Sequence, residues 1–145
     1  MKTVLTVAGS DPSGGAGIQA DIKTITAHGL YATSAITALT VQNTLGVSRV
    51  EPVPVDLVVQ QIDCVVGDIR PDAVKIGMLC NAEIVQAVAQ ALAHGQAECI
   101  VIDPVMISTS GHRLLDQEAV QWMKRKLFPM AQLITPNLPE AEALC

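Results

Sequence analysis

The chain has 145 residues, of which 50% are hydrophobic and 16% are charged, and its net charge is -5. This composition predicts a globular domain with a buried core and excludes a disordered or membrane-spanning chain. The acidic balance, the low number of Lys and Arg residues, which is 9, and an aromatic content of 2% argue against a nucleic-acid partner.

The cysteines and the first residues indicate a cytoplasmic protein. Cys64, Cys80, Cys99 and Cys145 are widely separated and form no C-x-x-C pair, so neither a zinc motif nor a redox motif is expected. The apolar segment over 4–8 is too short for a signal-peptide core or a membrane span. We therefore expect a protein of the reducing cytoplasm that has no membrane partner.

Apolar strand-like runs alternate with helical patterns along the chain. Strands are expected over 3–8, 34–41, 73–76, 99–102 and 132–134. Several of these runs are continuously apolar, which predicts that helices cover both faces of the sheet. Repeated strand-helix units predict an α/β fold with a doubly wound, mostly parallel sheet.

Capping residues mark the later helices. Asn81 and Asp116 precede apolar helical stripes and are expected to be N-caps. Asn137 and Glu140 have the spacing of a capping box, a local role that can coexist with ligand binding. The chain stops at Cys145, only about two turns into this last helix, so we expect a C-terminally truncated fold.

A glycine-rich loop joins the first strand to a helix. Gly9, Gly14, Gly15 and Gly17 permit positive φ and close backbone approach, which predicts N–H groups directed at an anionic or polar ligand. A Walker motif is excluded because no Lys-Ser/Thr pair follows Gly14. The match to G-x-G-x-x-A at Gly15 lacks the acidic residue that a dinucleotide site needs about 20 positions later. A strand-to-helix turn without a ligand is the alternative.

Polar or glycine residues follow strand after strand. Gly9, Gln42, Gly77, Asp103 and Asn137 lie just beyond the expected strand ends. Open parallel sheets bind ligands beyond the carboxyl ends of their strands. We therefore expect these residues to surround one shared cleft.

Four side chains near these ends have alternative roles. Asp21 can bind a substrate donor or accept N–H groups of the glycine loop. Gln42 has an amide suited to one edge of a heterocycle, or is an ordinary strand-end residue. Asp103 can hold Mg²⁺, directly or through water, or form an Asp-Pro turn. Lys75, a charge in an apolar strand, pairs with a carboxylate or extends outward, and we assign it no catalytic role.

Five segments together resemble a known family. They are 8–21 (AGSDPSGGAGIQAD), 36–44 (ITALTVQNT), 74–79 (VKIGML), 103–106 (DPVM) and 134–141 (ITPNLPEA). Because of these segments, the chain resembles the hydroxymethylpyrimidine/phosphomethylpyrimidine kinases of thiamine biosynthesis, which are members of the ribokinase-like superfamily. The resemblance extends over essentially the whole chain. The resemblance implies ATP-dependent phosphorylation of 4-amino-5-hydroxymethyl-2-methylpyrimidine and then of its monophosphate.

The resemblance also implies roles for substrate-binding residues. Gln42 would read the polar edge of the pyrimidine, and Asp21 and Gly9 would contact the substrate. Met78 and Val105 would line the ring. These roles agree with the expected cleft but come from the resemblance.

The remaining implied roles concern magnesium and ATP. Asp103, Asn137 and Glu140 match positions associated in the superfamily with Mg²⁺ and the nucleotide phosphates. Members continue into a C-terminal portion that carries the catalytic base and most of the ATP pocket, so residues 1–145 are expected to be the N-terminal part of a single kinase domain. No catalytic residue is assigned in this chain, and alone it is expected to be inactive.

Two rival functions remain open. A pyridoxal-type kinase of the same superfamily would use a similar cleft, although Gln42 and Met78 in their sequence contexts favour the pyrimidine. The second rival is a non-catalytic chain, either a module that binds a small molecule or a remnant that cannot fold stably. Relatives in the superfamily are often dimers, so a homodimer is also expected.

Overall fold

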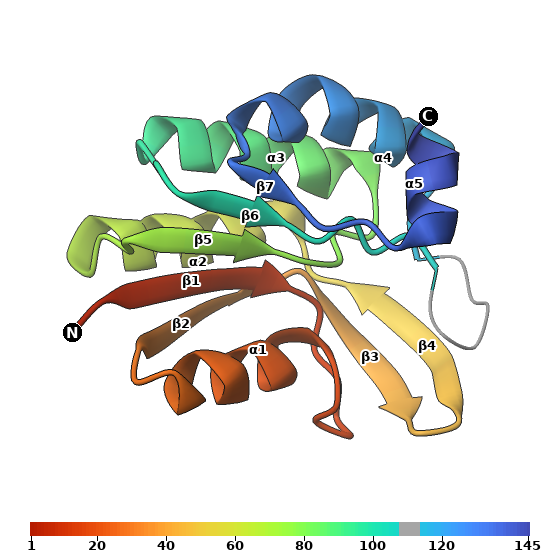
Figure 1. Cartoon of the computed structure of the whole chain (residues 1–145), viewed down its shortest axis with the longest axis horizontal. Coiled ribbons are helices and arrows are strands. Elements are labelled where there is room, and N and C mark those ends of the chain that lie inside the picture. The colour runs from red at the N-terminus through yellow and green to blue at the C-terminus, as the bar shows by residue number, and fades with distance from the viewer. Residues whose placement is uncertain (108–113) are drawn as a thin grey trace.

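A five-stranded parallel sheet forms the centre of the fold, in the order β2-β1-β5-β6-β7 (Figure 1). The computed structural model of the chain describes residues 1–107 and 114–145. The strands of the sheet are β1 (Thr3–Ala8), β2 (Tyr31–Ile36), β5 (Ala73–Ile76), β6 (Ile100–Ile102) and β7 (Leu133–Ile134). The predicted parallel α/β sheet is therefore confirmed, and its order reverses direction between β1 and β5.

Helices lie on both sides of this sheet, and the larger group packs on one face. The helices are α1 (Gly17–Ala27), α2 (Val55–Asp68), α3 (Ala82–His94), α4 (Gln117–Trp122) and α5 (Leu138–Leu144). After α4 the chain continues through a π-helical turn, Met123–Leu127, and a 3-10 turn, Phe128–Met130. None of the helices in the described residues is long and apolar enough to cross a bilayer.

The core lies between one face of the sheet and helices α2 and α3. Leu5, Val74 and Ile100 stand side by side across β1, β5 and β6 and are almost completely buried. Ile62 of α2 and Leu92 of α3 belong to the same apolar cluster and are fully buried. Burial of such side chains contributes roughly 1.5–3 kcal/mol each, which makes this face the main source of stability.

The opposite face is covered unevenly. Along the row Thr6, Lys75, Val101 and Leu133, burial falls from a fully buried Thr6 on β1 to a Leu133 on β7 that is 54% exposed. Helix α1 contacts β1 and β2 on this side. The expectation that helices cover both faces of the sheet therefore holds at β1 and fails at β7.

The strand expected over 34–41 is wrong, because the chain changes sheets at Thr37. Strand β2 ends at Ile36, and β3 (Ala38–Asn43) pairs antiparallel with β4 (Gly46–Pro52) in a separate hairpin. The Thr37 N–H donates to Ala8 O (3.0 Å), and its hydroxyl donates to Met78 O (2.6 Å). These bonds fix the break at the carboxyl edge of the sheet, from which the hairpin projects (Figure 1).

The predicted helix caps are confirmed. The Asn81 side chain accepts a hydrogen bond from the Ile84 N–H at the start of α3 (2.9 Å). The Asp116 side chain likewise accepts from the Ala119 N–H at the start of α4 (2.7 Å). Local side-chain chemistry therefore fixes where these helices begin.

Candidate active-site cavity

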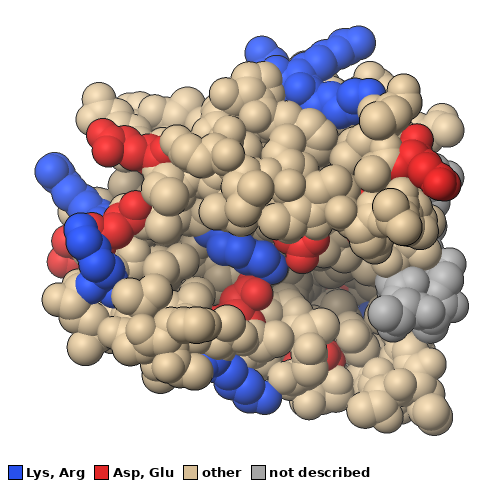
Figure 2. Space-filling model, viewed as in Figure 1, with Lys and Arg blue, Asp and Glu red and all other residues tan. Residues whose placement is uncertain are grey.

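A cavity of about 430 Å³ opens beyond the carboxyl ends of the sheet strands, next to the point where the strand order reverses. The β3–β4 hairpin and the start of α5 form further walls. Figure 2 shows a hollow on this face with acidic and basic side chains together at its edge. All the residues predicted to form the site line this one cavity: Gly9, Asp21, Gln42, Met78, Asp103, Val105, Asn137 and Glu140. The structure thus brings them together, while their individual roles remain predictions.

Asp11 organises the glycine loop, a role that the sequence reasoning missed. Its Oδ1 accepts from the N–H and hydroxyl of Ser13 (2.8 and 2.7 Å), and its Oδ2 accepts from the N–H groups of Gly15 and Ala16 (3.0 and 2.8 Å). The Gly14 N–H donates to Asp11 O. The expectation that loop N–H groups face a ligand is therefore wrong for Gly14 and Gly15, because the loop uses these two groups internally. An acidic residue ahead of a run of Gly and Ser was the available signal.

Two glycines of the loop are needed for close packing. A Cβ on Gly17, whose φ is +56°, would lie 2.3 Å from the carbonyl oxygen of Gly9. That same oxygen accepts the hydrogen bond from the Ile18 N–H that starts α1 (2.9 Å). A Cβ on Gly9 would lie 2.4 Å from Cε of Met78. Gly9 therefore allows the Met78 side chain to lie against the loop, where it forms part of the cavity wall.

Asp21 has partners that neither of its predicted alternatives included. Its Oδ2 accepts from the Thr6 hydroxyl (2.6 Å) and from Nζ of Lys75 (3.0 Å). Of the two alternatives stated for Lys75, pairing with a carboxylate is confirmed, and the same ammonium lies 4.0 Å from Oδ2 of Asp103. The Thr6 contact could not be predicted, since it depends on the packing of α1 against β1.

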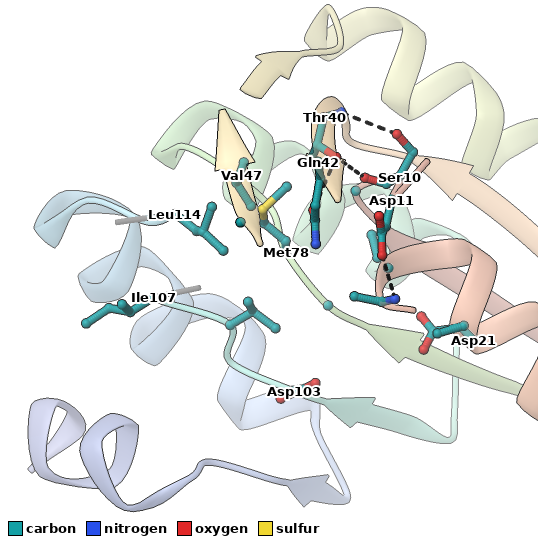
Figure 3. A pocket seen from close by; sticks show the side chains of 18 of the residues that line it. Ser10, Asp11, Asp21, Thr40, Gln42, Val47, Met78, Asp103, Ile107 and Leu114 are labelled. Carbon is teal, nitrogen blue, oxygen red and sulfur yellow. Dashed lines mark hydrogen bonds between the residues drawn. The ribbon is translucent and has the colours of Figure 1, made fainter. Parts of the chain in front are cut away.

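Gln42 presents its amide to the cavity from the hairpin. The Thr40 hydroxyl lies 2.8 Å from Ser10 O and 3.2 Å from Oε1 of Gln42, so the amide oxygen is turned toward Thr40. The amide nitrogen points into the cavity (Figure 3). Gln42 therefore offers a hydrogen-bond donor to a ligand, in a position that the glycine loop helps to fix through Ser10.

The wall beside Gln42 is apolar. Met78, which is 8% exposed, follows β5, and Val105 follows β6. Val47 of the hairpin and Leu114 extend this surface (Figure 3). An apolar wall facing one directed amide is suited to a small heterocyclic ring, whose faces are apolar and whose edge carries donors and acceptors.

Carboxylates dominate the other end of the cavity. Burial raises the pKa of Asp103 above its usual range; the Lys75 ammonium opposes this rise, and the carboxylates of Glu140 and Asp21 add to it. Such a group is stabilised in its charged form by an added cation.

Asn137 and Glu140 form the predicted capping box at the start of α5, which is confirmed. Asn137 Oδ1 accepts from the Glu140 N–H (2.8 Å), and Glu140 Oε2 accepts from the Asn137 N–H (2.9 Å). Within residues 1–107 and 114–145 no three His, Cys, Asp or Glu side chains are close enough to hold a metal alone. One or two carboxylates are nevertheless the usual protein contribution to Mg²⁺, which completes its shell with water and phosphate. Asp103 and Glu140 fit that donor set.

Comparison with known proteins identifies close relatives. The family model described as phosphomethylpyrimidine kinase matches residues 11–145. The hydroxymethylpyrimidine/phosphomethylpyrimidine kinase of Haemophilus influenzae is 52% identical over 144 residues, which are 99% of this chain and 54% of that protein. The chain thus spans about half the length of the curated relatives it matches.

Solved structures agree with this similarity. The crystal structure of phosphomethylpyrimidine kinase from Clostridium difficile 630 matches with a TM-score of 0.92 and 49% identity, covering 99% of this chain and 62% of that one. The pyridoxal kinase from Staphylococcus aureus in complex with pyridoxal matches with a TM-score of 0.87 and 36% identity, covering 99% and 53%. The same architecture therefore occurs in kinases named for two different ring substrates.

Proposed function

This chain belongs to the phosphomethylpyrimidine kinase family, and we propose that its cavity binds 4-amino-5-hydroxymethyl-2-methylpyrimidine and its monophosphate for phosphorylation by ATP. One observation carries the proposal: the Gln42 amide nitrogen faces a cavity whose adjoining wall is apolar and whose far end is acidic. The proposal concerns the whole protein, because the chain spans only part of its relatives' length.

The arrangement of the side chains supports a specific pose. The pyrimidine ring lies between Met78 and Val105, with Gly9 leaving room for the Met78 side chain. The Gln42 amide donates to a ring nitrogen, and Asp21 accepts from the amino or hydroxymethyl group of the substrate. This pose directs the hydroxyl group toward the acidic end of the cavity, where phosphoryl transfer would occur.

Magnesium and ATP complete the proposed reaction. Asp103 and Glu140 would hold Mg²⁺, with Asn137 at the mouth of α5 beside them. When bound, Mg²⁺ supplies neutralisation of the charge on the transferred phosphoryl group. We propose that residues 1–145 are the N-terminal, pyrimidine-binding part of a single kinase domain. In this proposal the catalytic base and most of the ATP pocket belong to the part of the family domain that the chain does not span.

A pyridoxal-type kinase is the second candidate, because structures of pyridoxal kinases match the whole chain. Calorimetric titration of the 145-residue chain with hydroxymethylpyrimidine and with pyridoxal separates the two. We expect tighter binding of the pyrimidine, and tighter binding of pyridoxal would reverse the assignment. Far-UV circular dichroism of the same sample checks that the chain is folded.

A Gln42→Leu variant tests the residue that carries the proposal. Loss of the donor should weaken pyrimidine binding about tenfold, because a polar ring atom is then buried without a partner. Gln117→Leu, at an exposed position of α4, is the matched control and should bind like the unmodified chain. Equal affinities of Gln42→Leu and the control would exclude Gln42 from the site.

A further inference from the structure

Lys75 is a charged side chain in the middle of the sheet, and no role in the proposed function accounts for it. It lies on β5 between the fully buried Thr6 of β1 and Val101 of β6. Its side chain is 25% exposed. Among the described residues that line the cavity, Lys75 is the single cation beside four carboxylates: Asp11, Asp21, Asp103 and Glu140.

The space beside the ammonium is narrow at Gly77. A Cβ on Gly77 would lie 3.1 Å from Nζ of Lys75 and 3.0 Å from Cβ of Ala8. Any larger residue after β5 would therefore crowd the ammonium. Glycine at position 77 thus leaves room for the Lys75 side chain, which reaches the cavity.

Lys75 and Thr6 both bind the same oxygen of Asp21. Oδ2 accepts from the Thr6 hydroxyl at 2.6 Å and from Nζ of Lys75 at 3.0 Å. Within the described part of the chain, Oδ1 of Asp21 has no hydrogen-bond partner. Two donors on one oxygen fix the rotation of the carboxylate and leave the other oxygen for a ligand.

The stability of the fold does not explain this arrangement. A partly buried ion pair contributes little net stability, because the loss of hydration offsets the attraction between the charges. Asp103, with Oδ2 4.0 Å from the same ammonium, adds a second negative charge near Asp21. Without the cation, the two carboxylates would repel each other and the Asp21 side chain would rotate away.

We propose that Lys75, together with Thr6, is a positioning residue that holds Asp21 with its free oxygen facing the donor group of the substrate. This inference rests on the proposed function and deepens it. Lys75 acts through Asp21 and does not itself touch the pyrimidine, so its removal should lower affinity for a ligand whose amino or hydroxymethyl group Asp21 accepts.

The test is calorimetric titration of hydroxymethylpyrimidine into the 145-residue chain and its variants. Lys75→Met should weaken binding about tenfold, since an acceptor displaced by about an ångström loses most of its hydrogen bond. Lys75→Arg keeps the cation and should bind within about threefold of the unmodified chain, which a purely steric role would not allow. Thr6→Val removes the second donor at nearly constant shape and gives an independent result if Lys75→Met does not fold.

Lys2→Met is the matched control, because Lys2 also pairs with an aspartate, Asp72, but at the amino end of the sheet. It should leave affinity unchanged. Unchanged affinity in both Lys75→Met and Thr6→Val, or equal losses in Lys75→Met and Lys75→Arg, would overturn the inference.

The titrations also distinguish failure of this inference from failure of the proposed function. If the unmodified, folded chain binds no hydroxymethylpyrimidine, the function is wrong, and a crystal structure of Lys75→Met still decides the positioning role. A carboxylate of Asp21 that has turned away from Thr6 supports that role. A carboxylate that remains in place contradicts it.

Discussion

Replacing Asp11 with Asn should loosen the glycine loop and lower the stability of the whole domain. Each carboxylate oxygen of Asp11 accepts two hydrogen bonds. Oδ1 accepts from the N–H and the hydroxyl of Ser13, and Oδ2 accepts from the N–H groups of Gly15 and Ala16. An amide has one acceptor oxygen, so its NH₂ group must face one of these pairs. The less costly orientation turns the NH₂ group toward Ser13, because the Ser13 hydroxyl can then accept a hydrogen bond from it. The backbone N–H of Ser13 is left without a partner.

The size of the loss follows from this count. One buried unpaired N–H costs about 1–3 kcal/mol. Asp11 itself is 2% exposed, but Ser13, Gly15 and Ala16 are exposed to solvent, so water recovers part of the cost. We expect the free energy of unfolding to fall by about 1–2 kcal/mol in Asp11→Asn. The loss should be larger, about 2–3 kcal/mol, in Asp11→Ala, which offers no acceptor.

Urea denaturation followed by circular dichroism at neutral pH measures both losses. Asp63→Asn is the matched control, because Asp63 is exposed on α2 and has no hydrogen-bond partner among the described residues. It should unfold at the same urea concentration as the unmodified chain. If Asp11→Asn also does so, the carboxylate does not hold the loop and our account of the loop is wrong.

Two further predictions concern the same loop. Burial alone would raise the pKa of Asp11, but the hydrogen bonds from Ser13, Ala16 and Gly15 outweigh burial and hold it below its usual range. Because the pKa in the folded state is lower than the unfolded value of about 3.9, this stabilisation is present above about pH 4 and is lost as the pH falls through the folded pKa. The stability difference between the unmodified chain and Asp11→Asn should therefore shrink in urea titrations below about pH 4; a constant difference would contradict the cause given. Gly17→Ala places a Cβ 2.3 Å from Gly9 O, whereas Gly29→Ala, also at positive φ, meets no atom within 4 Å. Thermal unfolding should show a loss of about 1–2 kcal/mol for Gly29→Ala and a clearly larger loss for Gly17→Ala, and equal losses would refute the packing role of Gly17.

Features that depend on neighbouring residues in the sequence could be predicted. Asn81, Asp116 and Asn137 begin their helices where the sequence places them, because an N-cap bonds to an N–H only a few residues away. The pairing of Lys75 with a carboxylate could also be predicted, since a charge in an apolar strand needs a partner wherever the strand lies.

Features that depend on tertiary contacts could not be predicted. The run over 34–41 has no local break signal, and its division at Thr37 is set by Ala8 and Met78, which are distant in sequence. The sequence left open whether Asp21 accepts N–H groups of the glycine loop, whereas in the structure Asp11 does so. Both carboxylates lie near the loop, and only the packing of α1 on β1 shows that Asp21 faces Thr6.

The candidate site was predicted better than its internal contacts. The carboxyl ends of parallel strands meet at one edge whatever the details of packing, so residues that follow the strands come together. The orientation of Gln42 depends on Thr40 and Ser10, and these contacts form in a hairpin that is separate from the main sheet.

The most direct test of the central claim is a crystal structure of the chain soaked with hydroxymethylpyrimidine. We predict that the ring lies between Met78 and Val105, with one edge on the Gln42 amide and its donor group on Oδ1 of Asp21. A ring bound elsewhere, for example in the groove beside Trp122 and Met130, or bound in the cavity without contact to Gln42 and Asp21, would contradict it.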